Sequence, residues 1–143
     1  MKKSDLAYTA GIVDGEGWIG ILLNKSKGRK PYYLMRVVVA NTNEWLIQWL
    51  KFGFGGYAYC RQSKANNTEP IWEWIITANK ALEFLKLIYP YLHLKKPQAE
   101  IAIKFQGSRR GVGHRLNEKE RAVTEAQRII MSGLNKKGQE MLI

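Results

Sequence analysis

The chain of 143 residues has the usual size of one domain, expected to span residues 1–143, and its 23 Lys and Arg against 12 Asp and Glu give a formal net charge of +11. Cys60 is the only cysteine, which excludes an intrachain disulfide and a zinc cluster built from cysteines and fits an intracellular protein. No stretch of 18 uninterrupted apolar residues occurs, so we expect no membrane span, and the positive charge favours nucleic acid over a membrane surface as the partner.

The first element expected is a short helix over residues 6–13. Ser4 is a good N-cap for it, and Asp5 places a negative charge in the first turn, where the helix dipole favours it. The glycines at positions 11, 15 and 17 are expected to stop the helix in an acidic turn, DGEG. Such a turn is often only a solvated helix end, but an acid beside a surface that binds a polyanion is repelled and needs a reason to be there.

Small residues recur along this helix. Ala7, Ala10 and Gly11 are spaced three and four apart, so they form a stripe with almost no side chain that a second helix can approach closely. If two copies of the helix packed through this stripe, Asp14 and Glu16 of each copy would lie near those of the other. Two such clusters require a divalent cation, because carboxylates that are not neutralised repel each other.

Two strands are predicted next, over residues 18–23 and 32–40. The polar loop between them carries four cations and no acid, which suits either a solvated hairpin tip or a contact with phosphate. In the second strand Arg36 is the only charge, and alternation places it on one face with Leu34 and Val38. A single arginine on an apolar strand face indicates a sheet that is covered on one side and meets an anion on the other.

The middle of the chain predicts a helix and two more strands. The helix is expected over residues 44–52, with an apolar stripe in the core made of Trp45, Leu46, Trp49 and Leu50. The strand over 57–61 places aromatic residues and a cation on one face, as a nucleic-acid surface requires: Tyr57, Tyr59 and Arg61. In the strand over 71–77, side-chain chemistry alone would bury Trp72, Trp74 and Ile76 and expose Glu73 and Thr77.

Three helices are predicted in the last part of the chain, over residues 80–88, 98–105 and 118–134. Asn79 is placed to cap the first of them, and Pro90 to end it. A basic, glycine-rich loop over 107–115 follows the second. Asn117 and Glu120 stand in capping-box positions at the start of the third. The predicted order of elements is therefore αββαββααα.

Two segments carry a resemblance to a known family. Residues 9–17, TAGIVDGEG, resemble the nine-residue signature of the LAGLIDADG homing endonucleases, with Thr9 in place of the first leucine and Glu16 in place of the last aspartate. Residues 90–99, PYLHLKKPQA, are similar to the P-aromatic-L-x-x-K-x-x-Q-A pattern of that family. The resemblance covers residues 5–134 and implies an α+β fold with an αββαββα core, a four-stranded antiparallel saddle-shaped sheet and extra C-terminal helices.

The same resemblance implies a function. Because the signature occurs once, it implies the single-motif, homodimeric type of homing endonuclease, whose partners are double-stranded DNA and a second copy of the chain, and not a membrane. Such a protein makes a metal-dependent double-strand break in a long, near-palindromic DNA site. The cofactor implied is Mg²⁺, with Mn²⁺ or Ca²⁺ in its place under some conditions, and no small-molecule cofactor is expected.

Three residues are expected to carry the chemistry. Glu16 from each subunit, with the backbone carbonyl of Gly15, would hold the metal. Lys95 matches the basic residue that the family places near the scissile phosphate, although a solvated loop lysine is the alternative. Asn41 matches the polar strand-end residue that positions water, with a helix N-cap as its alternative. Asp14 is expected to stabilise the turn rather than to bind the metal directly.

The remaining expectations concern surfaces. The residues expected to contact DNA lie on outward strand faces and in basic loops: Asn24, Lys25, Lys27, Arg29, Lys30, Arg36, Tyr59, Arg61, Lys64, Trp74, Arg109, Arg110 and Arg115. The dimer interface is expected at Ala7, Ala10, Gly11 and Asp14. Alignment with the family turns Trp72 and Trp74 toward the ligand, against the burial that their chemistry favours, so their face stays open.

A binding module on the same fold is the alternative function, either an RNA maturase that assists intron splicing or a DNA-binding protein that does not cleave. Glu16 discriminates between the two classes, because a protein that only binds has no use for an acid that phosphate repels.

Overall fold

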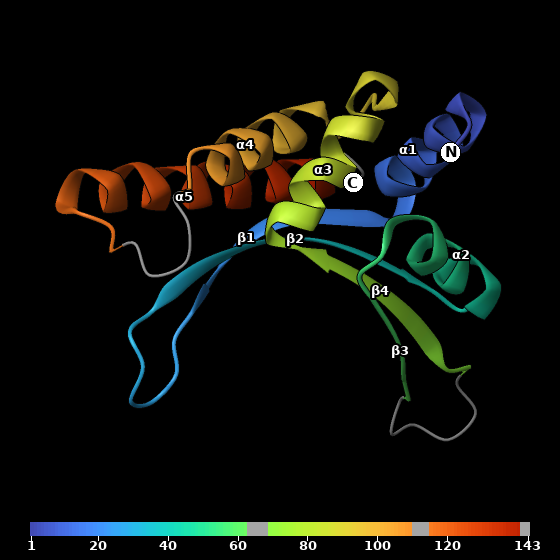
Figure 1. Ribbon diagram of the computed structural model, residues 1–143, viewed down its shortest axis with the longest axis horizontal. Coiled ribbons are helices and arrows are strands. Elements are labelled where there is room, and N and C mark those ends of the chain that lie inside the picture. Colours follow the sequence, from blue (N-terminus) through green and yellow to red (C-terminus); the bar gives the residue numbers. More distant parts are fainter. Residues whose placement is uncertain (63–68, 110–114, 141–143) are drawn as a thin grey trace.

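The computed structural model of the protein describes residues 1–62, 69–109 and 115–140. Its elements are α1 (Lys3–Glu16), β1 (Gly17–Asn24), β2 (Tyr32–Asn41), α2 (Glu44–Phe54), β3 (Tyr57–Arg61), β4 (Ile71–Thr77), α3 (Ala78–Ile88), the short 3₁₀ helix η1 (Tyr89–Tyr91), α4 (Lys96–Gly107) and α5 (Glu118–Glu140). The helices lie on one side of a single arched sheet, and the concave side of the arch is uncovered in the described part of the chain (Figure 1). The predicted α+β class with its αββαββα core, saddle-shaped sheet and extra C-terminal helices is confirmed.

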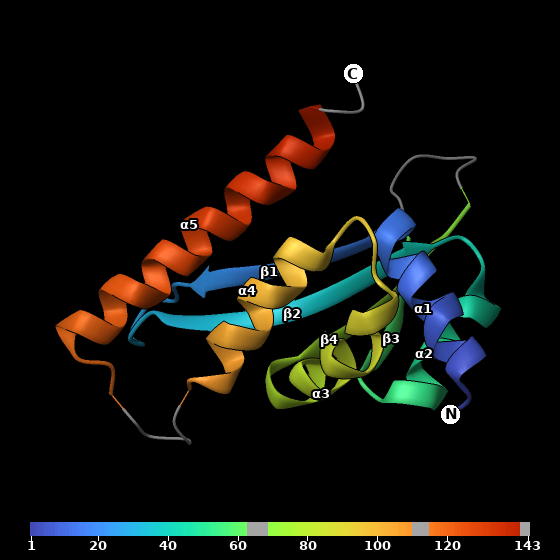
Figure 2. The ribbon, with the colours of Figure 1, turned by 90° about the horizontal axis from the view of Figure 1, so that it is seen from above.

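The sheet has the strand order β1-β2-β4-β3, and all neighbouring strands are antiparallel. In β2 the alternation of side chains directs Met35, Val37 and Val39 into the core, while Arg36 and Val38 take the concave face. This confirms the prediction that Arg36 lies on an apolar face opposite the covered one. Seen from above, α4 and α5 run beside β1 and β2 while α1, α2 and α3 gather toward the other end of the sheet (Figure 2). Among the described residues no helix has the length and apolar character needed to cross a membrane.

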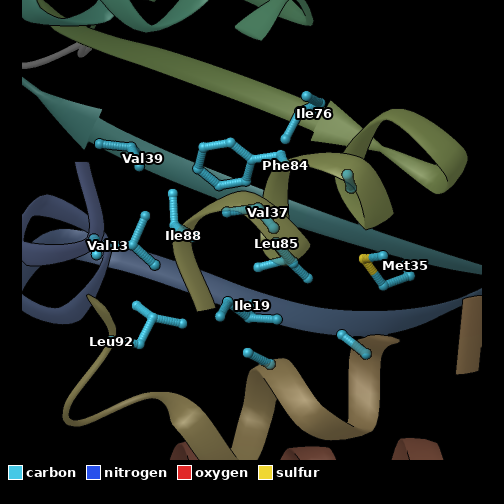
Figure 3. Packing of buried hydrophobic residues seen from close by; sticks show 14 of the residues in the cluster. Val13, Ile19, Met35, Val37, Val39, Ile76, Phe84, Leu85, Ile88 and Leu92 are labelled. Atoms are coloured by element: carbon cyan, nitrogen blue, oxygen red, sulfur yellow. The ribbon is translucent and has the colours of Figure 1, made fainter. Parts of the chain in front are cut away.

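The hydrophobic core lies between the convex face of the sheet and the helices. Ile19 of β1, Val37 of β2 and Ile76 of β4 meet Phe84 and Leu85 of α3 there (Figure 3). Every one of these side chains is almost completely removed from water, which is the main contribution to the stability of the fold.

Trp74 also belongs to this core, and its prediction as a DNA contact is wrong. The side chain is fully buried, and its Nε1 donates a hydrogen bond to the carbonyl of Gly55 at 2.8 Å. Its ring packs edge-on against Phe84, with ring centroids 5.0 Å apart. Because side chains alternate along β4, Trp74 and Ile76 point into the core and Glu73 points to the concave face. The face that side-chain chemistry favoured for Trp74 is therefore correct, and the face from family alignment is wrong, although Glu73 is only 8% exposed and not solvated as expected.

The first helix is longer than predicted. α1 begins at Lys3, with Lys2 rather than Ser4 in the N-cap position, and it runs through Gly11 and Gly15 to Glu16. The helix continues because Thr9, Ala10 and Val13 are buried against the rest of the fold, and this packing outweighs the low helix propensity of the two glycines. Gly17 ends it in an extended conformation, at a place where a Cβ atom would lie 2.8 Å from the Val13 carbonyl oxygen.

The aromatic stripe of α2 is only partly buried. The side chain of Asn43 caps this helix by accepting a hydrogen bond from the Leu46 amide at 3.3 Å. Ile47 and Leu50 are buried, whereas Trp45 is 65% exposed, so the prediction that Trp45 lies in the core is wrong. The phase of the helix explains the error, because the buried face is centred on Ile47 and Leu50 and Trp45 is turned away from it.

The last helices follow the predicted caps in one case and depart from them in the other. Asn117 and Glu120 form the predicted capping box at the start of α5: the Glu120 amide donates to Asn117 Oδ1 at 2.8 Å, and the Asn117 amide donates to Glu120 Oε1 at 3.4 Å. Asn79 is not a cap, because it lies inside α3 and accepts from Gln106 Nε2 of α4 at 2.9 Å. Both α4 and α5 extend beyond their predicted ends.

A polar cluster ties β2 to α5. The Tyr33 hydroxyl donates to Glu125 Oε2 at 2.7 Å, and Arg128 Nε donates to the same oxygen at 2.9 Å. These hydrogen bonds, first from Arg128 and then from Tyr33, lower the pKa of Glu125 to about 2. Since the ionised form is favoured in the folded state, the stabilisation by Glu125 is present above its ordinary pKa of 4.5 and is lost as the pH falls from there toward 2.

We therefore expect Glu125→Gln to lower the melting temperature at pH 7, and the difference from the unaltered protein to shrink steadily on acidification from about pH 5. Thermal unfolding followed by circular dichroism over this pH series measures the difference. In a Tyr33→Phe variant, which loses one of the two donors, the pH at which stability falls should move upward. A difference between Glu125→Gln and the unaltered protein that is constant with pH would contradict this account.

Candidate active site and nucleic-acid interface

The C-terminal end of α1 meets the end of β2. The chain reverses after Glu16 into β1, whose first residue, Gly17, pairs with Val39. As a result, Asn41 Nδ2 donates a hydrogen bond to Glu16 Oε2 at 2.7 Å, and Asn41 Oδ1 accepts from the Asn43 amide at 2.8 Å. Two of the three predicted catalytic residues are thus in direct contact. The alternative role of Asn41 as a helix N-cap is wrong, because Asn43 caps α2.

Asp14 holds the segment that carries the third predicted catalytic residue. Its carboxylate accepts three backbone hydrogen bonds, from the amides of His93 at 2.8 Å, Leu94 at 3.1 Å and Lys95 at 3.0 Å. In return, Lys95 Nζ donates to the backbone carbonyl of Asp14 at 2.7 Å. The Asp14 side chain is therefore occupied inside its own chain, as expected for a residue that stabilises the turn. Its predicted place in a dimer interface stays a prediction.

Lys95 is not a solvated loop lysine. It is half-buried, and burial lowers the pKa of its ammonium group, against the opposing effect of the nearby Asp14 charge. Its contact with a carbonyl in the last turn of α1 places a positive charge at the negative end of the helix dipole. The Lys95 ammonium group is thus held against the last turn of α1, the same turn that carries Glu16.

The charges at this helix end are unequally compensated. Asp14 and Glu16 both lie in the last turn of α1, which contains no basic residue, so each acid is repelled by the negative end of the dipole. Asp14 is compensated by three amides, whereas Glu16 is exposed and accepts a hydrogen bond from the neutral side chain of Asn41. The Glu16 carboxylate and the carbonyl of Gly15, one of the last carbonyls of the helix, are hard oxygen donors of the kind that Mg²⁺ prefers.

One copy of the chain supplies few acids here. Within residues 1–62, 69–109 and 115–140, no group of three or more His, Cys, Asp or Glu side chains lies close enough to hold a metal ion. The donor set of α1 therefore fits a divalent cation only if oxygen ligands are added from outside the chain, such as a second copy or a phosphate.

The concave face of the sheet carries the predicted Arg36, Tyr59 and Arg61, together with Glu73, which was expected to be exposed to solvent and is instead paired. Glu73 is only 8% exposed, and its Oε1 forms an ion pair with Arg61 Nη1 at 3.0 Å. Its other oxygen accepts a hydrogen bond from the Tyr59 hydroxyl, and this bond raises the pKa of Tyr59. Tyr59 lies directly opposite Glu73 in the sheet, so a register deduced from the β3–β4 hairpin would have indicated the contact.

The basic loop residues fall into three groups. The tip of the β1–β2 hairpin carries half-buried Asn24 and exposed cations on the side toward which the arch opens (Figure 1): Lys25, Lys27, Arg29 and Lys30. Arg115 is exposed before α5, whereas Arg109 lies over the Phe105 ring, 4.9 Å from its centroid, with Nη1 buried. Arg109 therefore makes an internal contact, and burial lowers the pKa of its guanidinium group. Its predicted contact with DNA stays a prediction. Lys64 and Arg110 lie outside the described residues.

The exposed face of α1 contains Ala7 and Gly11 of the predicted stripe, but not Ala10. Ala10 is completely buried within its own chain, so its prediction as a dimer contact is wrong. Ala7 and Gly11 are exposed, and Gly15 continues the same stripe one turn later. A Cβ atom added at either glycine would meet no atom within 4 Å, which leaves a smooth and open helix face.

Large apolar side chains border this smooth stripe. Tyr8 of α1 is 54% exposed, and α2 beside it exposes Trp45 at 65% and Phe52 at 94%. The two helices are joined by an edge-on contact between the rings of Tyr8 and Trp49, 5.6 Å apart. Exposed apolar groups gathered in this way are typical of a surface that meets another macromolecule.

Comparisons with known proteins agree with the fold. The sequence matches no protein-family model, and it matches no curated protein. Among solved structures, the chain is similar to the archaeal intron-encoded homing endonuclease I-Vdi141I in complex with DNA, with a TM-score of 0.73 and 13% identity over 94% of this chain and 86% of I-Vdi141I.

It is similar also to the homing endonuclease I-CvuI in complex with its target, with a TM-score of 0.67 and 18% identity over 93% of this chain and 81% of I-CvuI. A third similar structure, the LAGLIDADG homing endonuclease I-GzeII in complex with a DNA target, has a TM-score of 0.60 and 18% identity over 85% of this chain and 42% of the other. The arrangement of helices and strands, together with these similarities, shows that the chain has the fold of the LAGLIDADG homing endonucleases.

Proposed function

We propose that this protein is a homing endonuclease that, as a homodimer, cleaves both strands of a long and nearly palindromic DNA site with the help of a divalent metal ion. The observation that carries the proposal is Glu16, an exposed acid at the negative end of α1 in a chain of net charge +11. Such an acid destabilises its helix and repels DNA, so its position is explained best by a cation held between protein and phosphate.

The metal site that we propose uses Glu16 of each copy and the carbonyl of Gly15, with Mg²⁺ as the ion and Mn²⁺ or Ca²⁺ as substitutes. The I-CvuI structures were determined in the presence of Ca or Mg, which supports a divalent ion. A metal bound there would activate water and neutralise charge on the phosphate. The Glu16–Asn41 hydrogen bond supports the proposal because it orients the carboxylate.

Lys95 has the complementary role in this proposal. Its ammonium group, held by the Asp14 carbonyl, would stabilise the negative charge that develops on the phosphate during cleavage. Asp14 acts through the backbone. Its carboxylate accepts hydrogen bonds from the three amides at positions 93–95, and these bonds fix the position of the Lys95 backbone. Asn41 would orient Glu16 and any water bound beside it.

The concave face of the sheet is the surface that we propose lies in the major groove of DNA. Arg36, Tyr59 and Arg61 are the hydrogen-bond donors that we propose for it, and the exposed cations of the β1–β2 hairpin lie where they would reach the backbone phosphates. The DNA complexes of the similar structures support this placement.

We propose that the second copy packs against the exposed face of α1, at Ala7 and Gly11, and against Trp45 and Phe52 of α2. Two smooth helix faces can approach closely, and the aromatic border would contribute most of the buried apolar area. The chain aligns with 42% of I-GzeII, so two copies are needed to match the length of that protein. The pairing would bring both Glu16 carboxylates to the two-fold axis.

The proposal is tested by incubating the purified protein with a randomised DNA library in Mg²⁺ or in EDTA and sequencing the ends that are produced. We expect a double-strand cut at one nearly palindromic sequence, and only with Mg²⁺. Enrichment of bound DNA without cutting would support a non-cleaving DNA-binding protein, and preference for a structured RNA over duplex DNA would support a maturase.

We expect the affinity for DNA to fall steeply with salt. If the cations of the hairpin and the sheet neutralise about six phosphates per dimer, affinity should fall by roughly 10³-fold between 50 mM and 200 mM salt, because bound counterions are released. Fluorescence anisotropy over a salt series measures the slope. Binding that does not change with salt would contradict a role of the basic surface in holding the DNA backbone.

A further inference from the structure

Two neighbouring residue pairs lie on the concave face at the centre of the β1–β2 pair, and three of their four residues form a stacked unit: Trp18, Gly20 and Arg36. Gly20 of β1 lies directly opposite Arg36 of β2, and Trp18 lies opposite Val38, one pair farther along the same face. Alternation places all four on the side of the sheet that the helices leave uncovered.

The Trp18 ring explains why a glycine stands at position 20. A Cβ atom added at Gly20 would lie 2.1 Å from both Cη2 and Cζ2 of Trp18, which means that the indole ring lies directly over the Gly20 backbone. A glycine inside a strand weakens the strand, so its presence indicates that something must approach the backbone closely. Here that group is the Trp18 ring, which could not lie flat on the sheet over any larger residue.

The tryptophan in turn supports the arginine. The Arg36 guanidinium carbon lies 5.4 Å from the centroid of the Trp18 ring, within the range of a cation–π contact. Arg36 Nε is buried and has no hydrogen-bond partner among the described residues. The stem of Arg36 is therefore held by stacking on Trp18, unlike Arg61 on the same face, which is held by an ion pair with Glu73.

We propose that Trp18 is a positioning residue that holds Arg36 for a bidentate hydrogen bond to a guanine in the major groove, and that Gly20 provides the space for Trp18. The planar fork of a guanidinium matches O6 and N7 of guanine, and each such pair discriminates against other bases. Stacking fixes the plane of the fork before DNA arrives, which reduces the conformational freedom lost on binding. This inference rests on the proposed function, and it specifies one guanine in each half-site.

The test is selection of bound sequences from a randomised duplex library by the full-length protein in Ca²⁺, for the unaltered protein and for Arg36→Lys, Trp18→Leu and Gly20→Ala. We expect one symmetric pair of guanines in the selected site. Arg36→Lys keeps the charge and loses the fork, so preference for that guanine should fall by about 5- to 150-fold while the other positions keep theirs. Trp18→Leu and Gly20→Ala should lower the preference at the same position.

The controls separate positioning from general damage. Arg61→Ala removes a guanidinium from the same face and should leave the guanine at the Arg36 position intact, because Arg61 is held by Glu73. In a Trp18→Leu background, Gly20→Ala should have no further effect, since the ring that it displaces is gone. If Trp18→Leu lowers the melting temperature too far for selection, the guanine preference of Gly20→Ala, which keeps the tryptophan, tests the inference.

Preference for the guanine that persists in Gly20→Ala and Trp18→Leu would overturn the inference while leaving the proposed function intact. Loss at every position together would assign these residues a purely structural role and would overturn it as well. Failure of the unaltered protein to enrich any sequence would overturn the proposed function, and the inference would fall with it.

Discussion

Glu16→Gln is expected to reduce DNA cleavage by at least about 10³-fold while changing DNA affinity by no more than about tenfold. The substitution keeps the size of the side chain and its ability to accept from Asn41 Nδ2, so the local geometry should survive. It removes the charge that would hold a divalent cation beside the scissile phosphates. In each active site the loss falls on the transition state rather than on the binding of substrate.

Binding and cleavage have to be measured separately for this prediction. Affinity is measured by fluorescence anisotropy with Ca²⁺ and in EDTA, and cleavage by the appearance of both product ends over a Mg²⁺ series. In EDTA the variant should bind DNA at least as tightly as the unaltered protein, because a carboxylate that repels phosphate is gone.

Glu83→Gln is the matched control, because it makes the same chemical change at an exposed position of α3 on the helical side of the sheet. It should leave both cleavage and affinity unchanged. Cleavage by Glu16→Gln at the rate of the unaltered protein would end the assignment of the metal site, whereas loss of binding would show that Glu16 has a structural role.

Much of the sheet could be predicted because strand alternation is a local property. The position of Arg36 on the open face follows from the pattern in 32–40, and the burial of Trp74 follows from the chemistry of its neighbours in β4. The resemblance to the family also predicted roles for Glu16, Asn41 and Lys95, and the structure brings the first two into contact.

The phase of the helices could not be predicted in the same way. Ala7, Ala10 and Gly11 are all small, so their pattern marks two faces of α1 at once, and only the packed fold shows that Ala10 faces the core. In α2, Trp45 is as apolar as the buried Ile47, and sequence chemistry cannot tell a core residue from an interface residue.

Contacts between residues far apart in the sequence could not be predicted from the sequence either. Asp14 and Lys95 are 81 positions apart, and their reciprocal contacts depend on where η1 and the start of α4 lie beside the end of α1. Glu73 was expected to be exposed, because an isolated acid in a strand has no visible partner in the sequence. Its pairing with Arg61 follows from the register of β3 and β4.

Gly11→Leu is expected to weaken dimer formation by at least about 100-fold, or about 2.8 kcal/mol, without unfolding the protomer. A side chain at this position would project from the smooth face of α1 into the space that a second copy is proposed to occupy. Replacing a helical glycine by leucine stabilises the helix itself by roughly 0.5–1 kcal/mol, so the fold of the separate protomer should gain rather than lose stability. The mass measured by sedimentation at micromolar concentration should change from dimer to monomer.

Two other substitutions serve as controls for this prediction. Gly133→Leu makes the same change at an open position of α5, away from the proposed interface, and should leave the dimer intact. Ala10→Leu should instead lower the stability of the protomer by about 1–3 kcal/mol, because it overpacks a completely buried site. A folded Gly11→Leu protein that still sediments as a dimer would show that α1 does not form the interface, and the two Glu16 carboxylates would then have no reason to meet.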